Sequence, residues 1–215
     1  MGRKNQGFTF DQVFDENFSN VDVFTRSISP LIPNLFEGFN VTCMAYGITG
    51  AGKTYTMLGH KSDLQSKSFS GIGIMAIDAI FGIMNSIKDS DYQTTVRVSY
   101  LEVYNENIKD LLSTHKESNN LVIIEDPQKG IHVPGLKEVS VNSASDALKI
   151  ILQGNERRTM SPTSSNEFSS WSHAIILINL ERKPKDSNKP IISSKLSIVD
   201  LAGSEKESYE IREQK

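Results

Sequence analysis

Two spacings of hydrophobic residues alternate along the chain. Short runs rich in β-branched and aromatic residues predict strands, because those side chains fit a pleated and partly buried surface. Longer stretches in which apolar residues recur three or four positions apart predict helices. The predicted strands are residues 7–14, 41–46, 94–104, 121–126, 131–141, 172–182 and 191–203. The predicted helices are residues 21–40, 73–89 and 143–158.

Local signals refine these elements. Pro30 and Pro33 should kink the first helix, because proline lacks the N–H that a helix interior needs. Ser143 and Asp146 have the spacing of a capping box at the start of the third helix. Residues 105–112 are expected to add one or two helical turns. No internal repeat and no sharp boundary divides the chain, so we expect a single domain over residues 1–215.

Composition narrows the class of protein. Lys and Arg number 23 and Asp and Glu 26, so the net charge is −3 and gives no general reason to expect a nucleic-acid partner. Cys43 is the single cysteine, which excludes an intrachain disulfide and a cysteine-rich zinc site. The apolar stretch 71–87 is too short for a comfortable membrane span and contains Asp78 and Asn85. We therefore expect a protein of a reducing intracellular compartment, with no membrane partner.

Residues 47–54 read GITGAGKT and fit the pattern G-x-x-x-x-G-K-[ST] of a phosphate-binding loop. The loop follows the predicted strand 41–46, and its backbone N–H groups would form a cradle for anions. Lys53 would add positive charge for the phosphates, and Thr54 a hydroxyl for Mg²⁺. A flexible glycine turn beside a surface lysine is the alternative, but a chance match in this length is on the order of one in a hundred. The motif predicts an α/β fold whose mostly parallel central sheet is flanked by helices.

Two further stretches carry candidates for nucleotide hydrolysis. In LSIVDLAGSE (196–205), a β-branched run ends at Asp200, three residues before Gly203. A carboxylate there could assist Mg²⁺, and a glycine N–H could reach the γ-phosphate. In NEFSSWSHAI (166–175), serines, Asn166 and His173 could coordinate Mg²⁺ and order a water molecule. Taken alone, the first stretch could be an ordinary strand-to-turn junction and the second an ordinary polar loop.

Together, these three stretches resemble the kinesin motor domain. AYGITGAGKTYTMLG resembles its P-loop, NEFSSWSH its switch I and DLAGSE its switch II. FTFDQVF, EGFNVTCMAYG, VSYLEVYNENIKDLL and GNERRTMSPTSSNEFSS extend the similarity from about residue 7 to residue 206. TGAGKTYTMLG and GNERRT are also similar to the kinesins that control microtubule length at plus ends. A small GTPase is disfavoured, because NKPI (188–191) lacks the aspartate of the N-K-x-D guanine motif.

The resemblance implies a motor that hydrolyses Mg·ATP to Mg·ADP, moves along microtubules and belongs to the cytoplasmic cytoskeleton. Thr54 and Ser170 would ligate Mg²⁺, with Asp200 in its outer coordination sphere. Asn166, Ser169 and the Gly203 N–H would lie near the γ-phosphate, and Glu205 in the proton-relay region. The residues implied to wrap the nucleotide are Gly47, Ile48, Thr49, Gly50, Ala51, Gly52, Lys53 and Thr54, with Tyr55 near the adenine.

The chain departs from the kinesin pattern in three places. Trp171 stands where the family has a switch I arginine that pairs with the switch II glutamate, here Glu205. The R-x-R-P adenine contact is absent before residue 7, and residues 206–215 do not resemble the family's continuation. We therefore expect a motor domain that lacks both ends, binds microtubules weakly and hydrolyses ATP slowly. The alternative is an impaired relic that binds nucleotide or serves only as a binding module.

Overall fold

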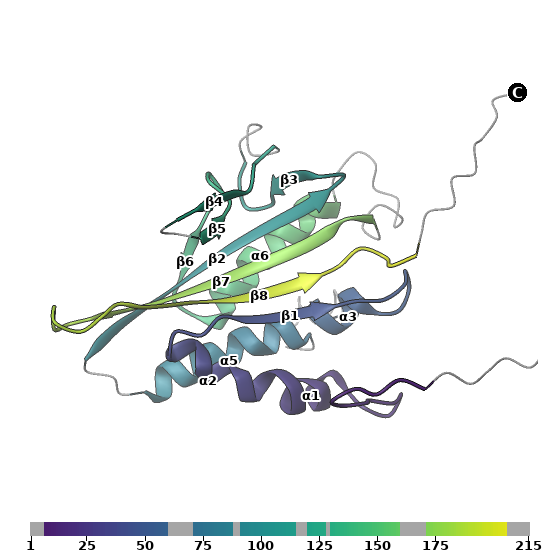
Figure 1. Cartoon of the computed structure of the whole chain (residues 1–215), viewed down its shortest axis with the longest axis horizontal. Coiled ribbons are helices and arrows are strands. Elements are labelled where there is room, and N and C mark those ends of the chain that lie inside the picture. Colours follow the sequence, from purple (N-terminus) through teal and green to yellow (C-terminus); the bar gives the residue numbers. More distant parts are fainter. Residues whose placement is uncertain are drawn as a thin grey trace, which may run out of the picture.

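A β-sheet forms the centre of the molecule in the computed structural model, which describes residues 7–59, 71–87, 91–114, 120–127, 130–159 and 171–205 (Figure 1). Its strands lie in the order β1-β8-β7-β2-β3, and β6 also pairs with β2. Their bounds are β1 Val41–Ala45, β2 Tyr92–Tyr104, β3 Asn107–Asp110, β6 Val139–Val141, β7 His173–Pro184 and β8 Ile192–Asp200. A separate hairpin consists of β4 (Ile124–Asp126) and β5 (Gly130–His132).

The helices pack on the face of the sheet that carries alternate apolar side chains. Ile176 and Ile178 of β7 and Ile198 of β8 are fully buried, and they share one hydrophobic core with residues of α2, α3, α5 and α6. The helical segments are α1 Asn20–Val23, η1 Phe24–Ile28, η2 Ser29–Leu31, α2 Ile32–Phe36, α3 Lys53–Leu58, α5 Ile72–Ser86 and α6 Ala144–Thr159. Among the described residues, no helix combines the length and the apolar character needed to cross a membrane.

The predicted α/β class is confirmed, but the mostly parallel sheet is wrong. Of the strand pairs in the described structure, β1 with β8 is parallel and the others are antiparallel. Short connections explain two of the antiparallel pairs. Residues 185–191 join β7 to β8, and Asn105 and Glu106 join β2 to β3. Such short connections cannot carry the chain back to the start of a parallel neighbour, so the strands they join run antiparallel. The sheet is therefore mixed.

Three local predictions are corrected. Residues 105–112 form the β2–β3 hairpin and not helical turns, because Asn105 and Glu106 adopt φ values of 46° and 63° and close a tight turn. Residues 7–14 contain no strand, and residues 131–141 divide into β5 and β6. The long helix predicted over residues 21–40 consists of short π, 3-10 and α segments, and Pro30 and Pro33 stand near the starts of η2 and α2.

The start of α6 agrees with its sequence signal. The Ser143 side chain accepts a hydrogen bond from the backbone N–H of Asp146 at 3.1 Å, as an N-cap serine should. This fixed start sets the helical phase of the residues that follow. Three turns later, Gly154 faces the ring of Tyr100 on β2, and Arg158 lies buried at the end of the helix near the carboxyl end of β8.

Gly154 is required for the close approach of α6 to the sheet. A Cβ atom at this position would collide with ring carbons of Tyr100, whose side chain is fully buried. We expect Gly154→Ala to lower the free energy of unfolding by about 1–3 kcal/mol, as overpacking of a core does. Gly82→Ala on α5 is the matched control, because its Cβ would meet nothing within 4 Å and alanine favours a helix over glycine by about 1 kcal/mol. Urea denaturation measures both variants, and equal stability of Gly154→Ala and the parent contradicts this packing.

Candidate nucleotide-binding site

The glycine-rich loop lies between β1 and α3, as a phosphate-binding loop should. β1 ends at Ala45, and α3 begins at Lys53. Gly50 and Gly52 have φ values of 80° and 89°, in the left-handed region that glycine adopts without strain. The loop is closed internally by the bond from the Ala51 N–H to the Ile48 carbonyl. The sequence thus folds locally into a tight turn that leads into a helix N-terminus, where backbone N–H groups favour anions.

Charged side chains of both signs lie on this loop. The Lys53 ammonium donates to the carbonyl oxygens of Gly47 and Ile48 at 3.0 and 2.9 Å. The Glu205 carboxylate accepts a hydrogen bond from the Thr49 N–H at 2.9 Å. Hydrogen bonding to the Thr49 side chain, followed by backbone hydrogen bonds and the charge of Lys53, lowers the pKa of Glu205 below its ordinary value. The loop therefore accepts an anionic group at Thr49 in this structure.

Residues 201–205 run along the loop. The Ser204 N–H donates to the Gly47 carbonyl at 3.0 Å, and the Leu201 N–H to the Ala45 carbonyl at 3.4 Å. The Ala202 N–H donates to Nδ1 of His173 at 3.1 Å, which ties this segment to the start of β7. A Cβ atom at Gly203 would collide with the Thr49 hydroxyl and the Glu205 carboxylate. Glycine at 203 thus lets the backbone approach the phosphate-binding loop closely.

Thr54 and Asp200 meet because β1 and β8 are parallel neighbours. Ala45, where β1 ends, lies opposite Asp200, so the helix after β1 begins beside the end of β8. The Thr54 hydroxyl donates to Oδ2 of Asp200 at 2.7 Å. Asp200 is only 3% exposed, and its Oδ1 has no hydrogen-bond partner in the described structure. A buried carboxylate oxygen without a donor is costly, and Mg²⁺ prefers such hard oxygen atoms. Thr54 and Asp200 therefore fit the surroundings of a Mg²⁺ ion.

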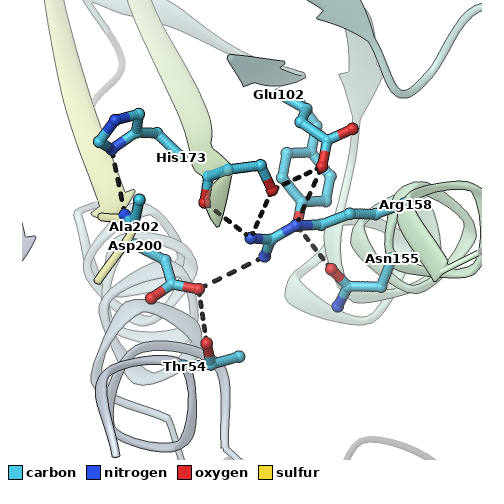
Figure 2. Close-up of polar contacts among 9 residues, drawn as sticks. Thr54, Glu102, Asn155, Arg158, His173, Asp200 and Ala202 are labelled. Atoms are coloured by element: carbon cyan, nitrogen blue, oxygen red, sulfur yellow. Dashed lines mark hydrogen bonds and ion pairs between the residues drawn. The ribbon is translucent and has the colours of Figure 1, made fainter. Parts of the chain in front are cut away.

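A buried polar cluster lies beside Asp200, on the side away from Thr54 (Figure 2). Arg158 NH1 lies 3.4 Å from Asp200 Oδ2, and Arg158 Nε lies 3.4 Å from Glu102 Oε1. Arg158 NH2 donates to the carbonyl and hydroxyl oxygens of Ser172 at 3.2 Å each. The Ser172 hydroxyl in turn donates to Glu102 at 2.7 Å. Burial raises the pKa of the neighbouring Tyr100 to about 12, so its hydroxyl stays protonated at neutral pH.

Sequence reasoning missed Glu102 and Arg158. It offered Ser172 among the serines of residues 166–175 for Mg²⁺ or a water molecule, but the Ser172 hydroxyl contacts Arg158 and Glu102 instead. One signal was available, because Glu102 interrupts the mainly apolar sequence VSYLEVY of a predicted strand, and it ends the buried run 98–102 in the structure. A charged residue in such a stretch requires a charged or hydrogen-bonding partner. No local pattern identifies that partner, since Arg158 stands on a helix far along the chain.

The structure brings most of the predicted site residues together. The loop residues 47–54 lie beside Asp200, Gly203 and Glu205 through the contacts above. Tyr55 is 54% exposed on α3, and its carbonyl accepts from the Asn20 side chain at 3.3 Å. Trp171 is 49% exposed. Three predicted residues, Asn166, Ser169 and Ser170, lie outside the described residues.

Comparisons with known proteins agree with this arrangement. A model of the kinesin motor domain matches residues 1–215. The chain is 43% identical over 204 residues to the chromosome-associated kinesin KIF4 of Mus musculus, an alignment that covers 94% of this chain and 16% of that protein. It is 42% identical over 202 residues to the kinesin-like protein KIP3 of Saccharomyces cerevisiae, covering 93% of this chain and 24% of that protein.

A solved structure of a fast kinesin, described for its ATPase mechanism and interactions with microtubules, superposes with a TM-score of 0.87 and 36% identity. The match covers 99% of this chain and 59% of that chain, so the chain spans less than two thirds of each of these relatives. Relatives with different names match at nearly equal identity, and the resemblance to the length-controlling kinesins stays a prediction. Family model, sequence relatives and fold agree, and the chain belongs to the kinesin motor domain family.

Proposed function

We propose that residues 1–215 act as a single kinesin-type motor unit that binds Mg·ATP and Mg·ADP at residues 47–54. The observation that carries this proposal is the contact between the Thr54 hydroxyl and the buried Asp200 carboxylate. It joins the first turn of the helix after a glycine loop to the end of the adjacent parallel strand. That is the place where a P-loop enzyme needs oxygen atoms for its Mg²⁺ ion.

Each group of the loop has a defined task in this proposal. The N–H groups of residues 47–54 would hold the phosphates, and the Lys53 ammonium, which donates to loop carbonyls in this structure, would supply positive charge to them. Thr54 and Ser170 would ligate Mg²⁺, and Asp200 would belong to its outer coordination sphere. Bound Mg²⁺ would neutralise part of the phosphate charge.

The remaining predicted residues are proposed to serve hydrolysis. The Gly203 N–H, Asn166 and Ser169 would serve the γ-phosphate and the attacking water, and Glu205 would serve in the proton relay. Glu205 must first release the Thr49 N–H, because phosphate oxygens and the carboxylate compete for that donor. Tyr55 would lie near the adenine.

Hydrolysis of ATP and binding to microtubules are proposed from family membership. We propose that hydrolysis is slow, because Trp171 cannot form the charged contact with Glu205. We also propose that this stretch alone binds microtubules weakly, since it matches 59% of the solved kinesin chain. A second candidate, a nucleotide-binding module without turnover, is favoured by the Glu205–Thr49 contact, which holds the glutamate on the loop.

Steady-state ATPase measurements with and without microtubules, beside calorimetry with Mg·ADP and Mg·ATP, separate the two candidates. We expect both nucleotides to bind, a low rate of hydrolysis that microtubules raise, and weak cosedimentation with microtubules. Binding with no turnover under any condition favours the binding module. Absence of nucleotide binding contradicts both functions, and tight, nucleotide-dependent cosedimentation contradicts the proposed weak binding.

A further inference from the structure

We infer that Arg158 is a positioning residue that fixes the Asp200 carboxylate for the magnesium side of the nucleotide site; this inference rests on the proposed function. Arg158 stands near the end of α6 and touches none of the residues proposed to hold the phosphates in the contacts described above. Its influence on the site passes through Asp200. Nothing in the sequence motifs pointed to this role.

The contacts of Arg158 come from two strands of the sheet and from the residue that precedes a third strand. NH1 faces Asp200 at the end of β8, Nε faces Glu102 on β2, and NH2 donates to Ser172 directly before β7. All four side chains are buried, between 1% and 7% exposed. Figure 2 shows the guanidinium between the two carboxylates, with Thr54 approaching Asp200 from its other side. The planar guanidinium can address all three partners at once, which a lysine ammonium at the end of a flexible chain cannot do.

The arrangement leaves one oxygen of Asp200 available. Thr54 and Arg158 both contact Oδ2, whereas Oδ1 has no hydrogen-bond partner among the described residues. Both described contacts therefore orient the carboxylate through the same oxygen. Without Arg158, the buried Asp200 would keep the Thr54 hydroxyl alone on Oδ2 and could rotate.

Charge within the cluster supports the same role. Glu102 and Asp200 carry two negative charges and Arg158 one positive charge, so the buried cluster retains an excess of one negative charge. A cluster that served only to hold α6 on the sheet would gain from neutrality, because buried charge is costly when it is not compensated. Asp200 is the carboxylate of this pair that also contacts Thr54, so a cation beside Thr54 would compensate the excess. Arg158 therefore keeps Asp200 partly, but not fully, neutralised.

The test measures how much Mg²⁺ contributes to ADP binding, which separates positioning from folding. The affinity for ADP is measured by calorimetry in excess MgCl₂ and again in EDTA, for the parent chain and for Arg158→Lys. Loss of a group that orients a metal-binding residue costs roughly 10- to 100-fold in metal affinity. We expect the Mg²⁺-dependent gain in ADP affinity to fall by about tenfold or more, while the affinity in EDTA stays unchanged.

Arg157→Lys is the matched control. Arg157 precedes Arg158 on the same helix and donates to the Leu111 and Ser113 carbonyls, away from Asp200. Its substitution should leave the Mg²⁺-dependent gain at the parent value. If Arg158→Lys does not fold, as judged by circular dichroism, the pair Arg158→Met with Glu102→Gln removes both charges together. Removing a buried pair together is better tolerated than removing one partner, and the same loss of Mg²⁺ dependence is expected.

The outcomes are distinct. A folded Arg158 variant that retains the parent's Mg²⁺-dependent gain overturns the positioning role and leaves the proposed nucleotide site standing. An equal loss in Arg157→Lys and Arg158→Lys also overturns it, since the effect is then general to the end of α6. If the parent binds no ADP in either condition, the proposed function fails, and the inference fails with it.

Discussion

Lys53→Ala is expected to remove most of the affinity of this chain for ATP and ADP. A charged hydrogen-bond donor typically contributes about 1.5–3 kcal/mol, which corresponds to a loss of roughly 10- to 150-fold in affinity at 25 °C. The Lys53 ammonium also donates to the carbonyl oxygens of Gly47 and Ile48. Alanine would therefore remove both the positive charge and two contacts that shape the loop.

Calorimetry with Mg·ADP provides the measurement. Lys149→Ala is the matched control, because Lys149 is an exposed lysine whose described partner, Asp146, lies one turn away on the same helix. It removes the same charge from the chain without touching the loop and should bind nucleotide as the parent does. Equal affinity of Lys53→Ala and the parent would show that nucleotide binds elsewhere.

The part of the site that follows from local chemistry could be predicted from sequence. Gly50 and Gly52 occur where the backbone adopts positive φ, and Lys53 follows directly at the start of α3. Asp200 could also be placed, because a β-branched run ends there. Backbone geometry and element ends depend mainly on neighbouring residues, so a short motif is sufficient to specify them.

Strand direction and the buried cluster could not be predicted in the same way. The antiparallel pairing of β2 with β7 depends on which segments pack together over a long separation in the chain. In the sequence, Arg158 is one of two arginines at a helix end, where charged side chains are usually exposed to solvent. Its burial between Glu102 and Asp200 results from the packing of α6 on the sheet. Neither the direction of the strands nor the burial of Arg158 is indicated by a local sequence pattern.

The contact that Glu205 makes in the structure could not be predicted from the sequence either. The family pattern places an arginine opposite this glutamate, and this chain has Trp171 there. In the structure, the Glu205 carboxylate accepts from the Thr49 N–H instead. Its lowered pKa means that this contact is present at neutral pH and is lost as the pH falls through the lowered value. At neutral pH, the ionised Glu205 carboxylate therefore competes with phosphate oxygens for the Thr49 N–H.

Trp171→Arg is expected to raise the rate of ATP hydrolysis by roughly 10²- to 10³-fold, the usual effect of one well-placed donor in an active site. Arginine at this position can form a charge-assisted, two-point contact with the Glu205 carboxylate. The indole of tryptophan has only one N–H donor and no charge, and the Trp171 side chain is half exposed. An arginine partner would also draw Glu205 away from the Thr49 N–H, which frees that donor for the γ-phosphate.

Steady-state ATPase rates of the parent, Trp171→Arg and Trp171→Leu provide the test. Leucine removes the bulk and the indole N–H without adding charge, so it should hydrolyse ATP as slowly as the parent. If leucine and arginine accelerate hydrolysis equally, the bulk of tryptophan is the defect and the charged contact is not. If all three proteins hydrolyse ATP at one measurable rate, the contact between residues 171 and 205 does not limit catalysis. The double variant Trp171→Arg with Glu205→Gln is a further control. Its rate of ATP hydrolysis should fall back towards that of the parent, because a neutral amide cannot replace the carboxylate that the arginine requires.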